Sequence, residues 1–183
     1  MTPAGQLESF IAKFAPANQR LIRASRARLR RRFPAANELV YDNYNFLVVA
    51  NCPTEKPGDS YFSIGADKNG ANVFFGYTGT KLADPRRLLQ GTGARNRFLR
   101  LDAAGALDRP AIVALLEASI AVSKPLPPGR GRLIVASVSP RHARAADGAR
   151  RRRRGRRPPR RRPGRRRRAA RRSWPPPGRP AGP

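Results

Sequence analysis

The segment formed by residues 141–183 places the strongest constraint on how this chain can fold. It contains no Val, Ile, Leu, Met or Phe, and Trp174 is its one large apolar side chain. Ordering the backbone costs about 1–2 kcal/mol per residue, and a segment this poor in apolar surface cannot offset that cost by burial. We therefore predict a disordered tail over residues 141–183 and a folded domain over residues 1–140.

Arginine gives this tail a net charge of +18, whereas residues 1–140 carry +10. Clustered guanidinium groups bind phosphates and release counterions, so one interpretation is an arm that contacts nucleic acid. Its candidate contacts are Arg151, Arg152, Arg153, Arg154, Arg165, Arg166 and Trp174. The alternative is a reading-frame artefact, because 39 of the 43 residues are Arg, Pro, Ala or Gly, which codons made of G and C alone encode.

Several classes of protein are disfavoured by what the sequence lacks. No apolar run approaches the length of about 18 residues that a membrane-spanning helix needs, and the first residues do not resemble a secretory signal. Cys52 is the single cysteine, which excludes an intramolecular disulfide framework and a multi-cysteine zinc site. We expect a cytoplasmic protein without a membrane partner or a bound cofactor.

Apolar spacing and turn residues divide residues 1–140 into helices and strands. Helices are expected over residues 3–14, 17–32 and 110–120, with Thr2 and Asp108 as N-caps, and a short helical turn over 84–89. Strands are expected over residues 44–50, 60–66, 73–77, 97–101 and, at an edge, 133–138, with a hairpin turn at 67–70. This order predicts a two-layer α+β domain, in which an antiparallel sheet of about four to five strands is packed by helices.

A mixed group of aromatic, amide and carboxylate side chains is the first candidate site. It comprises Glu38, Tyr41, Asn43, Tyr44 and Asn45, at a predicted junction between a helix and a strand. Such a mixture can line a pocket that holds a small ligand through a few fixed polar groups. The alternative is structural, with the tyrosines packed in the core and the amides capping turns.

Basic residues supply two further candidates. Gly91 and Gly93, followed by Arg95 and Arg97, are a candidate contact for an anion. The alternatives there are an ordinary turn beside a surface arginine and a pairing of Arg97 with Asp84. The second candidate is a phosphate-facing helix, whose alternative is a solvated helix surface. Its basic residues are Arg20, Arg23, Arg26, Arg28, Arg30, Arg31 and Arg32.

Two motifs resemble those of the YdhG-like family, also called domain of unknown function 1801. The first spans Pro34 to Asn45, with Glu38, Leu39 and Tyr41 followed by Asp-Asn-Tyr-Asn. The second is Leu-Ala-Asp-Pro at 82–85, followed by Leu-Leu-Gln-Gly-Thr-Gly at 88–93 and Arg97. The resemblance covers about residues 5–140. It implies a frataxin-like α+β fold, and for some members the role of an intracellular iron chaperone.

The residues themselves favour a binding protein over an enzyme. Cys52 has no base beside it, and His142, the single histidine, falls in the predicted tail, so no pair of nucleophile and base is evident. The ten acidic residues of the folded part are scattered, although Fe would require clustered oxygen ligands. We expect a non-enzymatic module that binds a small ligand or a protein. The alternatives are a nucleic-acid-associated protein, acting through the basic helix and tail, and an iron chaperone.

Overall fold

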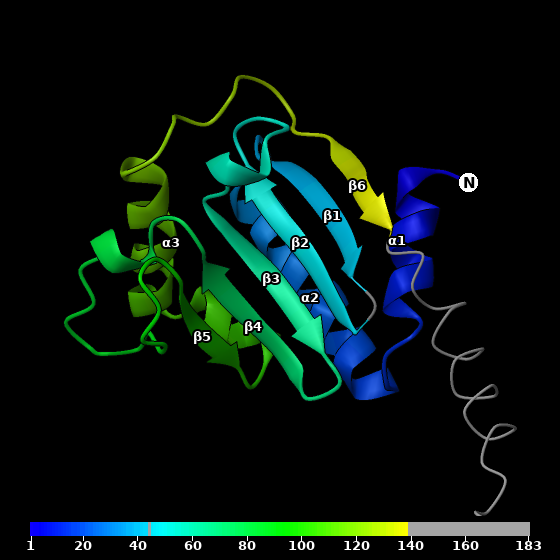
Figure 1. Ribbon diagram of the computed structural model, residues 1–183, viewed down its shortest axis with the longest axis horizontal. Helices are drawn as coiled ribbons and strands as arrows, with labels where there is room; N and C mark the ends of the chain where they lie inside the picture. The colour runs from blue at the N-terminus through cyan, green and yellow to red at the C-terminus, as the bar shows by residue number, and fades with distance from the viewer. Residues whose placement is uncertain (44, 139–183) are drawn as a thin grey trace, which may run out of the picture. The chain divides into compact units, whose positions relative to one another are not determined.

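A six-stranded mixed sheet forms the centre of the protein (Figure 1). The computed structural model describes residues 1–43 and 45–138, which fall within one compact unit, residues 1–145. The predicted tail, residues 141–183, lies outside the described residues. The strand order is β5-β4-β3-β2-β1-β6. The strands are β1 (Asn37–Asn43), β2 (Phe46–Cys52), β3 (Phe62–Asp67), β4 (Gly70–Phe75), β5 (Arg97–Leu101) and β6 (Leu133–Val138).

The prediction of an antiparallel sheet with four to five strands is wrong in two respects. The described residues contain a sixth strand, β1, where a junction between helix and strand was expected. Both faces of β1 are buried, so its sequence lacks the alternation that marks a half-exposed strand. The sheet is also mixed, because β6 pairs with β1 in parallel while the other neighbours are antiparallel. The edge position predicted for residues 133–138 is confirmed.

Each of the three described α-helices begins with a proline, which has the backbone angle of a first helical residue and no N–H to leave unpaired. The helices are α1 (Pro3–Ile11), α2 (Pro16–Arg32) and α3 (Pro110–Ala121). Thr2 caps α1 as predicted, and its Oγ1 accepts from the Gly5 N–H at 3.2 Å. The predicted cap of α3 is wrong, because Arg109 occupies the N-cap and Asp108 accepts from Arg28 instead.

Short 3₁₀ helices occupy three of the connections: η1 (Pro57–Asp59), η2 (Gly79–Lys81) and η3 (Ala104–Asp108). The turn expected at residues 67–70 joins β3 to β4, which confirms that hairpin. The expected helical turn over residues 84–89 is not helical, although residues 84 and 87 are joined by one backbone hydrogen bond of 3.0 Å. The first helix ends at Ile11 rather than Phe14.

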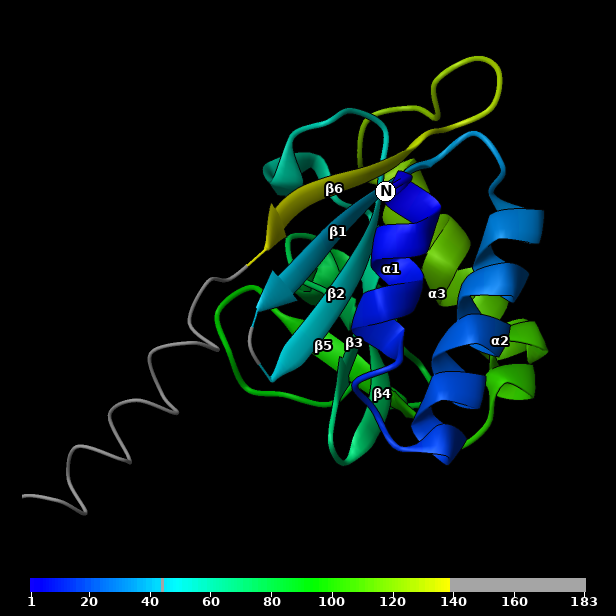
Figure 2. The same ribbon diagram turned by 90° about the vertical axis from the view of Figure 1, so that its right-hand side faces the viewer.

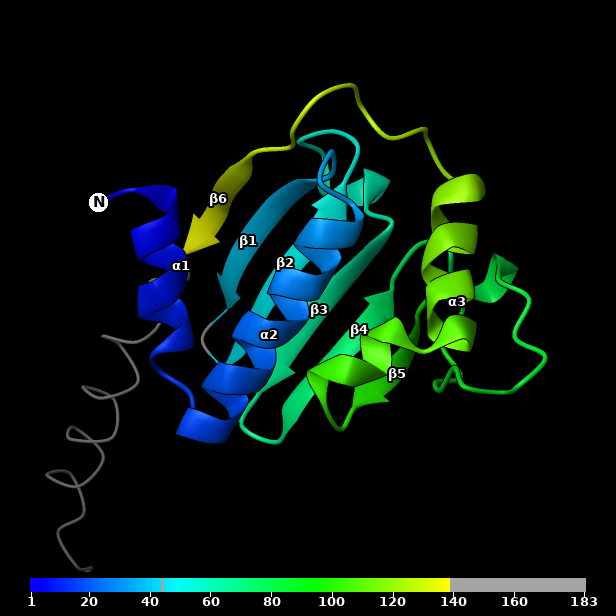
Figure 3. The same cartoon turned by 180° about the vertical axis from the view of Figure 1, so that it is seen from behind.

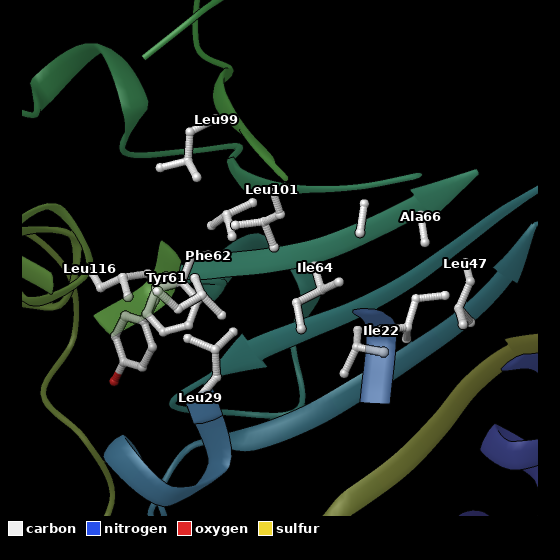
Figure 4. Packing of buried hydrophobic residues seen from close by; sticks show 14 of the residues in the cluster. Ile22, Leu29, Leu47, Tyr61, Phe62, Ile64, Ala66, Leu99, Leu101 and Leu116 are labelled. Atoms are coloured by element: carbon white, nitrogen blue, oxygen red, sulfur yellow. The ribbon is translucent and has the colours of Figure 1, made fainter. Parts of the chain in front are cut away.

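All three α-helices cover the same face of the sheet (Figure 2). Seen from behind, α1 lies beside β6, α2 crosses the middle strands and α3 lies toward β5 (Figure 3). The main core lies in this layer and includes Ile22 and Leu29 of α2, Ile64 of β3 and Leu116 of α3 (Figure 4). On the opposite face, Leu39, Ala50 and Cys52 form a second, smaller cluster with Tyr41, Val48 and Ile134.

No helix in the described part of the chain is both long enough and apolar enough to cross a membrane.

Candidate ligand-binding cleft

The alternation of side chains along β1 separates the residues that the sequence grouped into one pocket. Glu38 is buried on the helix-covered face, whereas Tyr41 packs against the smaller cluster on the opposite face. Asn43 and Asn45 are exposed at the turn between β1 and β2, and Tyr44 lies outside the described residues. The predicted group is therefore not one pocket.

Glu38 has a structural role in the interior. Its carboxylate is 2% exposed and accepts two hydrogen bonds of 2.8 Å from Arg26, one from Nε to Oε1 and one from Nη2 to Oε2. Arg30 lies 3.6 Å from the same carboxylate. A buried carboxylate must be paired in this way, because an unpaired charge is very costly to remove from water. Glu38 joins β1 to α2, and nothing in this geometry leaves it available for a ligand.

The basic residues of α2 are mostly paired with acids. Five of its arginines form ion pairs within the described residues. The acids come from α1, β1, η3 and α3, so these side chains fasten α2 to its neighbours. The sequence could not show this, because the partners lie up to 85 positions away. The pairs are Arg23–Glu8, Arg26–Glu38, Arg28–Asp108, Arg30–Glu38 and Arg32–Glu117.

A cleft opens where three turns meet at one end of the sheet. Its volume is about 580 Å³, within the range of roughly 300–1,000 Å³ that is usual for small-molecule sites. The turns join α1 to α2, β1 to β2 and β3 to β4. Among the described residues of the predicted pocket, Asn45 alone lines it. The lining residues are Lys13, Phe14, Ala15, Asp42, Asn45, Phe46, Asp67 and Lys68.

An ion pair sits in the wall of this cleft. Lys13 Nζ lies 2.5 Å from Asp42 Oδ2, and the side chain of Asp42 is only 5% exposed. The same ammonium group lies 5.0 Å from the centre of the Phe10 ring, at a distance that gives a cation–π contact. The side chain of Lys13 is thereby fixed between α1 and β1, which gives the cleft a preformed charged wall.

The rest of the lining supplies one more cation, a second acid, an amide and two aromatic rings. The second acid is Asp67, whose carboxylate accepts from the backbone and side-chain nitrogens of Asn69 at 2.7 and 3.4 Å. Lys68 and Asn45 are exposed, while Phe14 and Phe46 are half-buried. The Asn18 amide donates to the backbone carbonyls of Asp67 and Lys68 at 3.4 and 3.2 Å, which anchors the β3–β4 turn to α2. This combination suits a ligand that has an apolar part and an anionic group.

The loop that contains the predicted anion contact is closed by its own arginine. Arg97 Nη1 donates to the carbonyl oxygens of Gly93 and Asn96 at 2.5 and 2.8 Å. The alternative pairing of Arg97 with Asp84 does not form, since Asp84 Oδ2 accepts from the Leu89 N–H at 2.7 Å. Gly91 has φ +102°, where a side chain would be strained, and the side chain of Arg95 is exposed.

The single cysteine lies in the smaller cluster, away from the cleft. Burial raises the pKa of the Cys52 thiol to about 11, so the thiolate that a nucleophile requires is scarce at neutral pH.

Burial also raises the pKa of Tyr61 to about 12. The hydroxyls of Tyr41 and Tyr61 have no hydrogen-bond partner among the described residues. His142 lies outside those residues.

Within residues 1–43 and 45–138, no three side chains of His, Cys, Asp or Glu come together as a group that could hold a metal ion. Comparisons with protein-family models, with curated proteins and with solved structures gave no match to this chain.

Proposed function

We propose that this protein is a non-enzymatic binding module that takes a small ligand in the cleft between its three turns. The observation that carries this proposal is the pairing of a 580 Å³ cleft with two lysines on its lining, Lys13 and Lys68. Lys13 is fixed by Asp42, whereas Lys68 forms no ion pair within the described residues. Lys68 is therefore the cation that meets an incoming anionic group.

The remaining groups of the cleft define the rest of the ligand. Phe14 and Phe46 offer apolar surface, and the amide of Asn45 can donate or accept a hydrogen bond. The favoured ligand is a small organic carboxylate or phosphate ester with an apolar or planar portion. The proposal includes membership of the YdhG-like family and a cytoplasmic location, which rest on the sequence alone.

A thermal-shift screen of the full chain tests this proposal. Small carboxylates and phosphate esters, each with an aromatic or aliphatic portion, are added at millimolar concentration, and the melting temperature is recorded. We expect at least one compound to raise the melting temperature, because a ligand that binds only the folded state stabilises it. We expect Lys68→Gln to remove that rise.

Lys56→Gln is the matched control for this experiment, because Lys56 is another exposed lysine and lies outside the cleft. The proposal predicts that Lys56→Gln retains the full rise in melting temperature. A rise that Lys56→Gln and Lys68→Gln reduce equally would indicate general charge screening and would contradict the proposed site.

An iron-binding role has only the family resemblance in its support. Three of the acids in the described residues are already engaged: Glu38 is paired with Arg26, Asp42 is paired with Lys13, and Asp59 accepts from Lys124 at 2.8 Å. Anaerobic titration with Fe(II), followed by calorimetry, tests this alternative. Binding at micromolar concentration would establish it in place of the organic ligand.

A further inference from the structure

Three phenylalanines form a row across the sheet face that the described helices leave open. They are Phe46 of β2, Phe74 of β4 and Phe98 of β5, all half-buried. The ring centres of Phe46 and Phe74 are 5.8 Å apart, and those of Phe74 and Phe98 are 5.6 Å apart. Aromatic rings at such distances contact one another, so the row is a continuous aromatic surface.

Gly65 of β3 makes this continuity possible. A Cβ atom at Gly65 would lie 2.5 Å from Cζ of Phe46 and 2.6 Å from Cε2 of Phe74. Any larger residue would therefore force the two rings apart. Because β3 contributes no side chain at this point, rings from β2 and β4 meet over its backbone.

Residues 81–100, the segment of the chain that includes Phe98, have an excess of positive charge. Residues 81–100 contain a single acid, Asp84, whose carboxylate accepts a hydrogen bond from the Leu89 N–H. None of the six basic residues there forms an ion pair within the described part of the chain, in contrast to most arginines of α2. These six are Lys81, Arg86, Arg87, Arg95, Arg97 and Arg100.

This basic segment and the aromatic row are in contact. The Phe98 ring lies 3.4 Å from the position that a Cβ atom of Gly91 would take, so the loop packs directly on the end of the row. Arg100 is exposed and follows Phe98 by two residues on β5, which places both on the same face of the sheet. Its Nη2 donates to the carbonyl of Asn69 at 3.2 Å.

We propose that this surface binds single-stranded nucleic acid. Unpaired bases stack on Phe46, Phe74 and Phe98, while phosphates lie against Arg100 and against the exposed Arg95 of the loop that packs on Phe98. Rows of aromatic rings on an open sheet, flanked by cations, suit this occupant, because every base has a face that can stack. A duplex keeps its bases stacked inside and offers the rings no partner. This inference is independent of the cleft ligand, although Phe46 borders both sites.

The first experiment measures the affinity of the full chain for a fluorescent 15-nucleotide oligothymidine and for a duplex of the same length, at 0.5 M NaCl. High salt weakens purely electrostatic binding by the arginine-rich segment 141–183, so that stacking is revealed. We expect the single strand to bind at least about tenfold more tightly than the duplex. We expect Phe98→Leu and Phe74→Leu to weaken single-strand binding at least about fivefold, as loss of a stacked base does.

Phe10→Leu is the matched control, because Phe10 is a buried phenylalanine on α1 and lies outside the row. It should leave oligonucleotide affinity unchanged. For charge, Arg100→Gln should lower the slope of log affinity against log salt by about 0.7, whereas Arg23→Gln should not change it. Circular dichroism is used to check that each variant is folded.

Photo-crosslinking of the unmodified protein gives a readout that does not depend on any variant folding. A 5-iodouracil oligonucleotide is irradiated with the full chain, and adducts are located by mass spectrometry. Adducts on Phe46, Phe74 or Phe98 support the proposal. Adducts confined to residues 141–183, or equal affinity for single strand and duplex, would overturn it. A dimer that Phe98→Leu dissociates, seen by sedimentation, would assign the surface to a second copy instead.

Discussion

Arg26 on α2 and Glu38 on β1 are joined by two parallel hydrogen bonds of 2.8 Å each, with the carboxylate almost completely buried. The planar guanidinium group matches the carboxylate in this geometry, which lysine cannot reproduce. The pair therefore fixes the position of α2 over the sheet. It also shows that an arginine-rich helix can serve the fold rather than a partner.

Glu38→Gln should lower the free energy of unfolding by about 3 kcal/mol. The substitution leaves Arg26 and Arg30 charged and partly buried without their carboxylate, and breaking such a pair from one side is costly. Urea denaturation monitored by circular dichroism measures the loss. Arg23→Gln, which breaks an exposed pair with Glu8 on the same helix, should cost less than about 1 kcal/mol. Equal losses in the two variants would contradict the structural role of Glu38.

Gly131→Ala should destabilise the protein by about 1–3 kcal/mol, because a Cβ atom there would overlap the backbone carbonyl of Ala36. The Gly131 N–H also donates to the carbonyl of Pro34 at 2.9 Å, which guides the chain into β6. Gly58→Ala is the control, since a Cβ atom at Gly58 meets nothing within 4 Å. If thermal melts show no difference between these two variants, the close approach of residue 131 to residue 36 is wrong.

The buried thiol of Cys52 should make the fold sensitive to alkaline pH. Because folding raises the pKa of Cys52 from 9.0 to about 11, its contribution to stability is complete below pH 9. That contribution is lost as pH rises from 9 to 11, by about 2 kcal/mol. Urea titrations at pH 7, 9 and 10.5 measure this loss. Cys52→Ala should reduce it between pH 9 and 10.5, and an unchanged pH profile in that variant would contradict the assignment.

The two lysines of the cleft should respond differently to substitution. Lys13→Gln removes the charged partner of buried Asp42 and should cost about 1–2 kcal/mol of stability. Lys68→Gln should leave stability within about 0.5 kcal/mol of the parent, because no ion pair of the described residues is lost. Chemical denaturation of both variants at pH 7 makes the comparison. A larger loss for Lys68→Gln than for Lys13→Gln would reverse the roles assigned to them.

Much of the fold could be predicted where local signals are strong. Prolines mark the starts of all three α-helices, and Asp67 to Gly70 marks the hairpin between β3 and β4. The strand β1 was missed because Glu38 and Asp42 are buried in it, and burial of acids is possible only with partners distant in sequence. The parallel pairing of β6 depends on a crossover from the opposite edge, which no local pattern encodes.

The sequence pointed to only one of the three turns that form the candidate site. The sequence drew attention to the turn that contains Asn45, and this turn does border the cleft. Lys13 and Lys68 could not be found in this way, because they come from other turns. Lys13 lies 29 residues before its partner Asp42, and Lys68 lies 23 residues after Asn45. The aromatic row could not be predicted from the sequence either. Phe46, Phe74 and Phe98 are brought together by strand pairing and by the absence of a side chain at Gly65.

The most direct test of the proposed binding site is an amide NMR titration of the full chain with the compound that most raises its melting temperature. We expect shifts that saturate with ligand and are concentrated in the three turns of the cleft, at residues 13–15, 42–46 and 67–68. Lys68→Gln should abolish these shifts while leaving the rest of the spectrum unchanged. Saturating shifts located elsewhere in the domain, with these turns unaffected, would show that the ligand does not bind in the cleft.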